Sequence, residues 1–214
     1  GTSYGSNGTF KTRTTPAITN YTGTYDGNTH SIAVGNTIAG DTVYYSLDNS
    51  TWSTTPITLT DVTTGTTVYV KVSNANYNDW FGNGTVTINA KGLTISGLTA
   101  ENKIYNGNTT AGLSFGSATL NGVVSGDNVS LDDDSYIANF NNKNVGDDNP
   151  VTISSIDLIG SDKGNYSLTL PTGLMADITP KGVTVSGLVA IDKEYDGNNS
   201  AGINFSGASL NGVL

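Results

Sequence analysis

The sequence contains no cysteine, and it has one histidine and one methionine in 214 residues. Without cysteine the chain has no disulfide framework, no thiol nucleophile and no thiolate metal ligand. The single histidine, His30, leaves no histidine pair for zinc. The absence of cysteine fits a reducing cytosol, and it fits equally well a bacterial surface protein whose domains fold without disulfides. A composition rich in Thr, Asn and Gly and poor in Lys and Glu favours the surface protein.

Positive charge and long apolar runs are also scarce. Nine Lys and Arg face eighteen Asp and Glu, which gives a net charge of −9. Proteins that bind phosphate groups need a basic stripe, so nucleic acid and anionic membranes are excluded as partners. No apolar stretch reaches the length of a membrane-spanning helix. No secretory signal begins the chain, so we expect Gly1 to be an internal start.

The apolar residues that are present alternate with Thr and Ser in short runs, which is typical of half-buried strands. Val68, Val70 and Val72 share one face of such a run, and Tyr69 and Lys71 share the other. Asn-Gly and Asp-Gly pairs between the runs are hairpin-turn signals. No segment has a helical period. About seven short strands in each 80–90 residues predict an all-β fold of immunoglobulin-like antiparallel β-sandwiches.

The chain repeats itself at a constant spacing. Tyr105-Asn106-Gly107 returns 90 residues later as Tyr195-Asp196-Gly197, Lys91-Gly92 returns as Lys181-Gly182, and Leu214 matches Val124. A period held without insertion indicates tandem modules of that length. Such arrays usually extend a protein in space or multiply its binding sites, and they do not usually build a single catalytic pocket. We expect the chain to be part of a longer array.

The repeats predict four segments. Residues 1–14 are the tail of a preceding module, 15–90 a first module, 91–180 a second, and 181–214 the incomplete start of a third. The junctions at 89–92 and 179–182 leave almost no free linker, so we expect the modules to form an extended rod. Strands are expected at 31–34, 42–47, 57–60, 66–72 and 84–89, and then at 93–98, 118–124, 128–131, 137–140, 151–159, 167–170 and 174–178.

The second module resembles the YDG-type repeat domain of large bacterial cell-surface proteins. The resemblance covers 91–180 and the opening of the third module. The sequence departs from the family pattern at Asn106, where the Tyr-Asp-Gly motif of the family has an aspartate. The third module has this aspartate, as Asp196. The matching motifs are Lys103-Ile104-Tyr105-Asn106-Gly107-Asn108-Thr109-Thr110, Leu120-Asn121-Gly122-Val123-Val124-Ser125-Gly126-Asp127, Lys143-Asn144-Val145-Gly146, Gly164-Asn165-Tyr166 and Ile178-Thr179-Pro180-Lys181.

The first module resembles the related MBG-type immunoglobulin-like surface repeat. Together the two resemblances imply an extracellular protein with many modules, adhesin-like or matrix-like, and they imply no catalytic residues. The motifs of the first module are Thr24-Tyr25-Asp26-Gly27-Asn28-Thr29-His30, Val43-Tyr44-Tyr45-Ser46-Leu47-Asp48 with Trp52, Val68-Tyr69-Val70-Lys71-Val72 and Asn74-Ala75-Asn76-Tyr77.

Few residues are candidates for a site. Trp52 and Trp80 suit stacking on sugar rings, or else pack in the core and at an edge. Asp132–Asp134 with Asp127, and Asp147–Asp148, are either calcium ligands or solvated loop acids. Lys103 and Asn165 occur in the chain order that a Lys–Asn isopeptide crosslink requires. Such a crosslink needs a buried Lys, and burying an unpaired Lys costs free energy of folding. The Tyr-Asp-Gly motif is interpreted as a structural corner.

We therefore predict no enzyme, and we assign no catalytic, cofactor or metal residue. The predicted function is a stalk or spacer in a large secreted bacterial adhesin, matrix or filament protein. The alternative is a carbohydrate-binding β-sandwich that uses exposed aromatic side chains. Expected partners are neighbouring modules, identical chains in a filament, or surface glycans. The expected location is the cell surface or the extracellular matrix.

Overall fold

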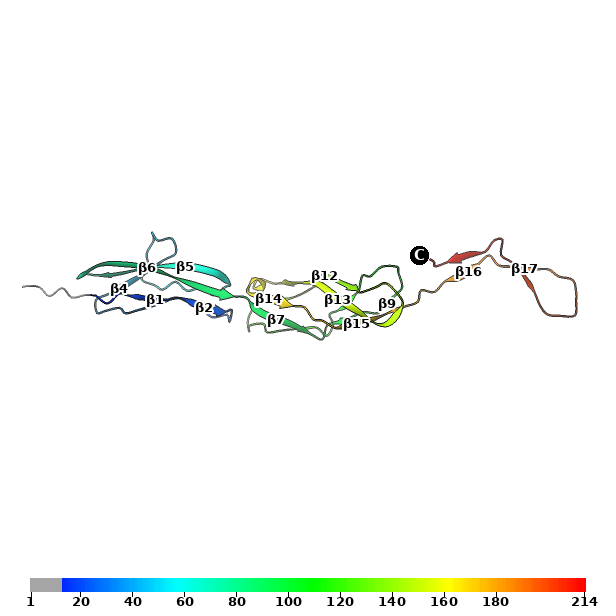
Figure 1. Ribbon diagram of the computed structural model, residues 1–214, viewed down its shortest axis with the longest axis horizontal. Helices are drawn as coiled ribbons and strands as arrows, with labels where there is room; N and C mark the ends of the chain where they lie inside the picture. The colour runs from blue at the N-terminus through cyan, green and yellow to red at the C-terminus, as the bar shows by residue number, and fades with distance from the viewer. Residues whose placement is uncertain (1–12) are drawn as a thin grey trace, which may run out of the picture. The chain divides into compact units, whose positions relative to one another are not determined.

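The computed structural model of the chain describes residues 13–214, which form an all-β protein with no α-helix among them (Figure 1). No helix in this described part is long and apolar enough to span a membrane. The elements are β1 (Ala17–Thr19), β2 (Tyr21–Thr24), β3 (Ala33–Gly35), β4 (Thr42–Ser46), β5 (Thr63–Asn74), β6 (Tyr77–Asn89), β7 (Lys91–Ser96), β8 (Thr99–Ala100), β9 (Lys103–Ile104), β10 (Leu113–Ser114), β11 (Thr119–Asn121), β12 (Ser130–Phe140), β13 (Gly146–Ile159), the 3₁₀ turn η1 (Lys163–Asn165), β14 (Tyr166–Thr169), β15 (Leu174–Thr179), β16 (Thr184–Ser186), β17 (Val189–Ile191), β18 (Gly202–Asn204) and β19 (Ser209–Asn211).

The chain divides into two compact units that do not follow the sequence repeats. Unit 1 contains the described residues up to Leu93 together with 122–129 and 160–168. Unit 2 contains 94–121, 130–159 and 169–214. The start of the second repeat and two of its later segments, one of which includes η1 and most of β14, are therefore part of unit 1. The module boundaries expected from the sequence stay a prediction, and the first expected segment lies almost wholly outside the described residues.

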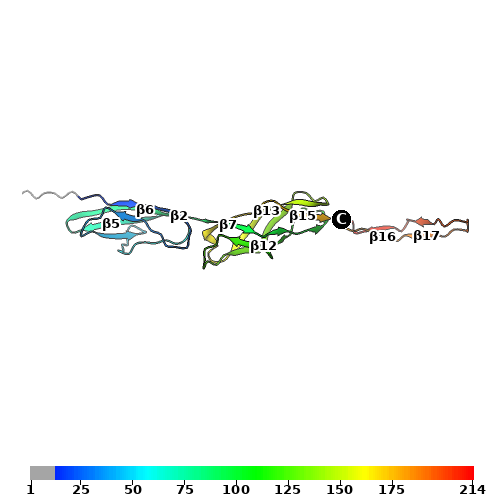
Figure 2. The ribbon, with the colours of Figure 1, turned by 90° about the horizontal axis from the view of Figure 1, so that it is seen from below.

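The core of unit 1 lies on a four-stranded sheet with the strand order β2-β6-β5-β4. Val68, Val70 and Val72 on β5 are completely buried, as their alternation predicts. Val86 and Ile88 on β6 are buried beside them. β5 and β6 run side by side over most of their length, as Figures 1 and 2 both show.

A second layer, the pair β1-β3, packs against this sheet at Gly84 of β6. A Cβ atom at Gly84 would lie 2.5 Å from Ile18 Cγ2 and 3.1 Å from Ile32 Cγ2. Glycine is therefore required there for the two layers to approach, and the close contact accounts for one of the Asn-Gly pairs in the sequence.

Most strand pairs are antiparallel, as expected, but two pairs are parallel. β2 runs parallel to β6, with Gly23 opposite Ile88, and β9 runs parallel to β15, with Lys103 opposite Ile178. Parallel neighbours need a long connection, and each pair joins the first part of a repeat to its last strand. The prediction of a wholly antiparallel arrangement was wrong at these two places.

The second repeat builds three sheets, with the strand orders β12-β13-β15-β9, β11-β7-β14 and β10-β8. β12 joins the strands predicted at 128–131 and 137–140 into one, with an irregular register between Leu131 and Tyr136. The buried hydrophobic side chains include Leu93, Ala138, Phe140, Ile153 and Ile178.

The third repeat begins with the same strand pairing as the second. Leu120 pairs with Ile95 between β11 and β7, and Leu210 pairs with Val185 between β19 and β16, each 90 residues later. The side chains of 181–214 are exposed throughout. The 90-residue period is thus a period of structure as well as of sequence.

Candidate functional site

The Tyr-Asp-Gly turn of the first repeat is built by its own backbone and one carboxylate. β2 ends just before the turn, where the Tyr25 N–H donates to Asn89 O at 2.8 Å, and Gly27 supplies the positive φ of 79°. The Asp26 carboxylate accepts from the Asn28 N–H at 2.9 Å and contacts His30 Nε2 at 2.9 Å. These bonds, the backbone one foremost, lower the pKa of Asp26 to about 2.

The buried ring of Tyr25 reaches a carboxylate far away in the sequence. Tyr25 is 4% exposed, and its hydroxyl donates to Asp127 Oδ2 at 2.7 Å. The Tyr166 hydroxyl donates to the same oxygen at 2.5 Å and accepts from the Val124 N–H at 2.9 Å. The two tyrosine rings meet edge to face, with centroids 5.4 Å apart. These side chains, the tyrosine–carboxylate cluster (Tyr25, Asp127 and Tyr166), all belong to unit 1.

The environment of the cluster keeps both phenols neutral. Burial, and then the hydrogen bond to Asp127, raise the pKa of Tyr25 well above its usual value near 10. The pKa of Tyr166 is raised by the same causes in the same order. A phenol with a raised pKa is a poor proton acceptor near neutrality. The chemistry of the cluster is therefore hydrogen bonding between chain segments.

Asn165 makes a second contact between distant segments of unit 1. Its side chain is 5% exposed. The Asn165 carboxamide oxygen accepts from the Val62 N–H at 2.9 Å, and its NH₂ group donates to Asp61 Oδ1 at 3.0 Å. Both ends of the buried amide are thus satisfied by the loop before β5.

The two tryptophans of the proposed sugar platform lie on opposite faces of the β4-β5-β6 sheet. Trp80 pairs across the strands with Val72, whose side chain points into the core. Trp52 meets the exposed Phe81 edge to face at 6.1 Å and lies beside Lys71, whose Nζ is 5.5 Å from the centre of the indole ring. Since Lys71 and Val72 are neighbours on one strand, they face opposite ways. A platform made of both tryptophans is therefore not formed.

The two acidic clusters lie in strands. Asp132 to Asp134 belong to β12, where Asp132 Oδ1 accepts from the Asp134 N–H at 3.1 Å. Asp147 and Asp148 belong to β13, where the Asp148 N–H donates to Asp177 Oδ1 at 2.9 Å. Within residues 13–214 no three His, Cys, Asp or Glu side chains are grouped closely enough to hold a metal ion. Asp127, which the sequence grouped with Asp132–Asp134, has a different environment, since it accepts the two tyrosine hydroxyls.

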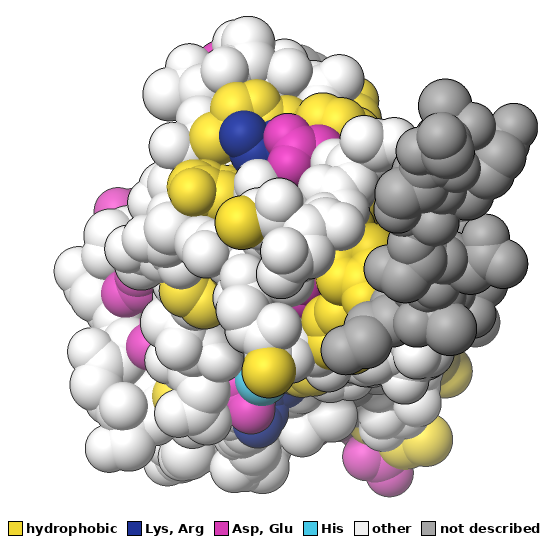
Figure 3. Space-filling model, turned by 90° about the vertical axis from the view of Figure 1, so that its left-hand side faces the viewer, with side chains coloured by type: hydrophobic (Ala, Val, Ile, Leu, Met, Phe, Trp, Pro, Cys, Tyr) yellow, Lys and Arg dark blue, Asp and Glu magenta, His cyan; other side chains and the backbone are white. Residues whose placement is uncertain are grey.

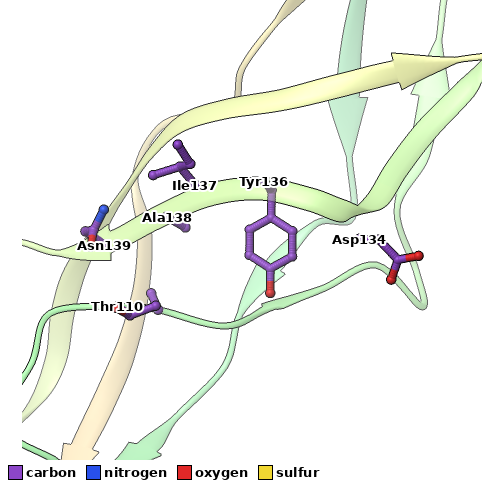
Figure 4. Close-up of a pocket in the computed structure, with 7 residues that line it drawn as sticks. Thr110, Asp134, Tyr136, Ile137, Ala138 and Asn139 are labelled. Atoms are coloured by element: carbon purple, nitrogen blue, oxygen red, sulfur yellow. The ribbon is translucent and has the colours of Figure 1, made fainter.

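Asp134 also borders a shallow hollow of about 400 Å³ beside β12 (Figure 4). In the close-up, Asp134 and Asn139 lie at opposite ends of the hollow, and Tyr136 points toward the segment that carries Thr110. The Tyr136 hydroxyl accepts from the Leu113 N–H at 3.2 Å, so it is engaged in holding that segment. Asp134 is the one carboxyl group among the lining residues, which gives the hollow no acid–base pair.

The other sequence candidates have separate partners. His30 stacks on Tyr21 at 4.1 Å and contacts Asp26, so its ring is fixed in the turn. The Lys103 ammonium donates to Asn108 O at 2.8 Å and to Thr110 O at 2.9 Å. Lys103 and Asn165 thus each have their own hydrogen-bonding partners, and the isopeptide hypothesis gains no support.

The face shown in Figure 3 has no basic region for a polyanion among its described residues. On the face in Figure 3, acidic, basic and hydrophobic side chains are interspersed among uncharged polar ones, within the described residues. The low count of Lys and Arg accounts for this pattern.

Asp61 and the role of Asp127 were missed by the sequence reasoning. A signal for Asp127 is present, because the turn from Val124 to Asp127 has the same form as the turn from Ile38 to Asp41. In each, the acid N–H donates to the carbonyl three residues back, at 3.2 Å and 3.1 Å, and follows a glycine with positive φ. Nothing local in the sequence marks Asp61 as the partner of an asparagine 104 residues away.

The family model of the YDG domain matches residues 89–173. This match confirms the YDG-type domain. It spans most of the second repeat, and the MBG-type assignment of the first repeat stays a prediction. No curated protein matches the chain.

Among solved structures, the chain is similar to SGBP-B of the Bacteroides ovatus mixed-linkage glucan utilization locus, in complex with a mixed-linkage heptasaccharide. The identity is 12% and the TM-score 0.26, over 73% of this chain and 48% of that one. The chain thus spans about half of that protein, and a likeness this weak carries no argument about the ligand of this chain.

Proposed function

We propose that the chain is a stalk or spacer segment of a large secreted bacterial surface, matrix or filament protein. In this proposal the YDG domain and its neighbours are immunoglobulin-like modules that extend as a rod and have no catalytic activity. Their partners are the adjacent modules and, in a filament, identical chains. The location that goes with this function is the cell surface or the extracellular matrix.

The observation that carries the proposal is the contact of Asn165 with Asp61 and Val62. Asn165 belongs to the second sequence repeat, and Asp61 and Val62 belong to the first. A buried amide that bonds two repeats directly does not suit a free linker, because breaking the contact would leave its polar atoms unsatisfied. Direct contacts between successive repeats are what a spacer needs to keep its reach.

A second candidate function rests on the row Tyr44, Lys71 and Phe81, which are cross-strand neighbours on the outer face of the sheet. Lys71 Nζ lies 4.5 Å from the Tyr44 ring, and Trp52 covers the same face. Phe81 is 60% exposed. Aromatic faces of this kind stack on sugar rings, so a glycan-binding module is the alternative.

The two functions are separated by measuring binding of the full chain to a broad glycan array, with the Trp52→Ala variant as the matched control. The spacer predicts no saturable binding by either protein. Saturable binding that the intact chain shows and Trp52→Ala loses, with an unchanged circular dichroism spectrum, would overturn the spacer in favour of recognition.

A further inference from the structure

The Tyr-Asx-Gly turn occurs three times, at Tyr25, Tyr105 and Tyr195. In the first two repeats it is built alike, because Tyr105 N–H donates to Thr179 O at 2.8 Å as Tyr25 N–H does to Asn89 O. The glycine of each turn has a positive φ, between 79° and 84° across the three turns. The first two turns therefore share one backbone form, and the third has the same glycine conformation.

The first turn is covered by the Gly-Asp loop, which we define as residues 122–127. A Cβ atom at Gly27 would lie 2.8 Å from Val124 Cγ1, so Val124 fills the space that the missing side chain leaves. Beside this contact the Tyr25 hydroxyl donates to Asp127. Both contacts are internal to unit 1, yet they join the first sequence repeat to the second.

The second turn meets the same position of the next repeat. A Cβ atom at Gly107 would lie 3.5 Å from Leu214 Cδ1, and Leu214 is the residue 90 positions after Val124. This contact is internal to unit 2. Two different turns therefore contact the same element of the repeat that follows each of them.

The corresponding acid of the first repeat also accepts a donor from the chain before it. Asp41, which ends the turn that matches Val124–Asp127, accepts from Arg13 at 3.0 Å, and its side chain is 2% exposed. The acid after the glycine thus receives a side-chain donor from the preceding segment in both repeats, a guanidinium in one and a phenol in the other.

We propose that the Tyr-Asx-Gly turn is a docking element whose partner is the Gly-Asp loop of the following repeat. The glycine leaves room for the apolar residue of the loop, and the tyrosine hydroxyl binds the aspartate of the loop. The proposal rests on the spacer function, since a defined joint is useful in a chain of successive repeats. Tyr195 is 97% exposed and a Cβ atom at Gly197 would meet no atom within 4 Å, so the third turn is a control on which no loop is packed in the described residues.

The test uses the full chain, whose lack of cysteine allows two spin labels to be placed at Asn83→Cys and Lys163→Cys. Both positions are exposed and belong to unit 1, one on β6 and one in η1. The width of the distance distribution between the labels is measured by pulsed electron paramagnetic resonance. It is then compared in the Tyr25→Phe, Asp127→Ala and Tyr195→Phe backgrounds.

We expect a narrow distribution in the parent protein, a broader one with Tyr25→Phe and Asp127→Ala, and no change with the matched control Tyr195→Phe. Tyr25→Phe keeps the buried ring, so it remains informative if Asp127→Ala unfolds. An unchanged width with Tyr25→Phe would overturn the proposal. Failure of the spacer function would be seen in a different result: the parent chain would bind glycans although its distance distribution is narrow.

Discussion

Asp127 accepts hydrogen bonds from two tyrosine hydroxyls that are themselves removed from water. A carboxylate that serves two buried donors stabilises both only while the phenols keep their protons. The stability that the cluster gives to unit 1 therefore depends on pH in the alkaline range. Asp162 also lies near enough to favour the neutral phenols.

Raising the pH above about 10 is expected to destabilise unit 1. The pKa of Tyr25 is raised in the folded state, so the unfolded chain loses this proton first and the stabilisation is lost as pH rises. Below the unfolded pKa the contribution is fully present. Thermal unfolding between pH 8 and pH 11 should therefore show a steeper decline for the parent than for Tyr25→Phe. Equal slopes, with Tyr195→Phe as the exposed control, would contradict this.

Comparing Gly27→Ala with Gly197→Ala separates the effect of the contact with Val124 from the effect of backbone strain. Gly27 and Gly197 have φ values of 79° and 80°, but a Cβ at Gly197 meets no atom within 4 Å, whereas one at Gly27 meets Val124. Gly27→Ala should cost about 1–3 kcal/mol more than Gly197→Ala, as expected for overpacking. Denaturant unfolding of the two variants measures the difference. Equal costs would mean that Val124 does not seat on the turn.

Single residues were only partly foreseeable from the sequence. The Tyr-Asp-Gly motif was interpreted as a structural corner, and the hydrogen bonds of Asp26 show the corner that was expected. The partner of Tyr25 was not foreseeable, because Asp127 lies 102 residues away and local patterns carry no information about such pairs. Trp52 and Trp80 were grouped by type, and only the strand register shows that they face apart.

Among the strands, the predictions at 66–72 and 151–159 match the later parts of β5 and β13, and the prediction at 84–89 covers only the second half of β6. β5 and β13 follow from regular apolar spacing, since one face of each is buried. The strands β1, β2, β8, β9 and β10 were missed because each has two to four residues, too few to show a period. The parallel partners of β2 and β9 were missed because alternation identifies a buried face and not a neighbour.

Ile88→Ala is expected to destabilise unit 1 by about 2–5 kcal/mol, because the side chain is completely buried on β6. The matched control is Leu47→Ala, which follows β4 in unit 1, is 54% exposed and should change stability by less than about 0.5 kcal/mol. Chemical denaturation followed by tryptophan fluorescence reports on unit 1, where both tryptophans lie. Similar effects of the two substitutions would contradict the assigned core.

In the molecule as a whole, the 90-residue period is accompanied by contacts between one repeat and the next. The pairing of β7 with β11 recurs 90 residues later between β16 and β19, so the second and third repeats begin alike, and the YDG domain match covers most of the second. Asn165 and the tyrosine–carboxylate cluster explain how the first repeat and segments of the second become one compact unit. Contacts of this kind, made at one repeat after another, are what the proposed spacer function requires.

The most direct measurement is a set of backbone residual dipolar couplings from residues 15–90 and from 122–129 and 160–168 in the full chain. Direct docking predicts that a single alignment tensor fits all three segments, because they belong to one compact unit. Two tensors of different magnitude or orientation, one for 15–90 and another for the two later segments, would show a free hinge and contradict the account.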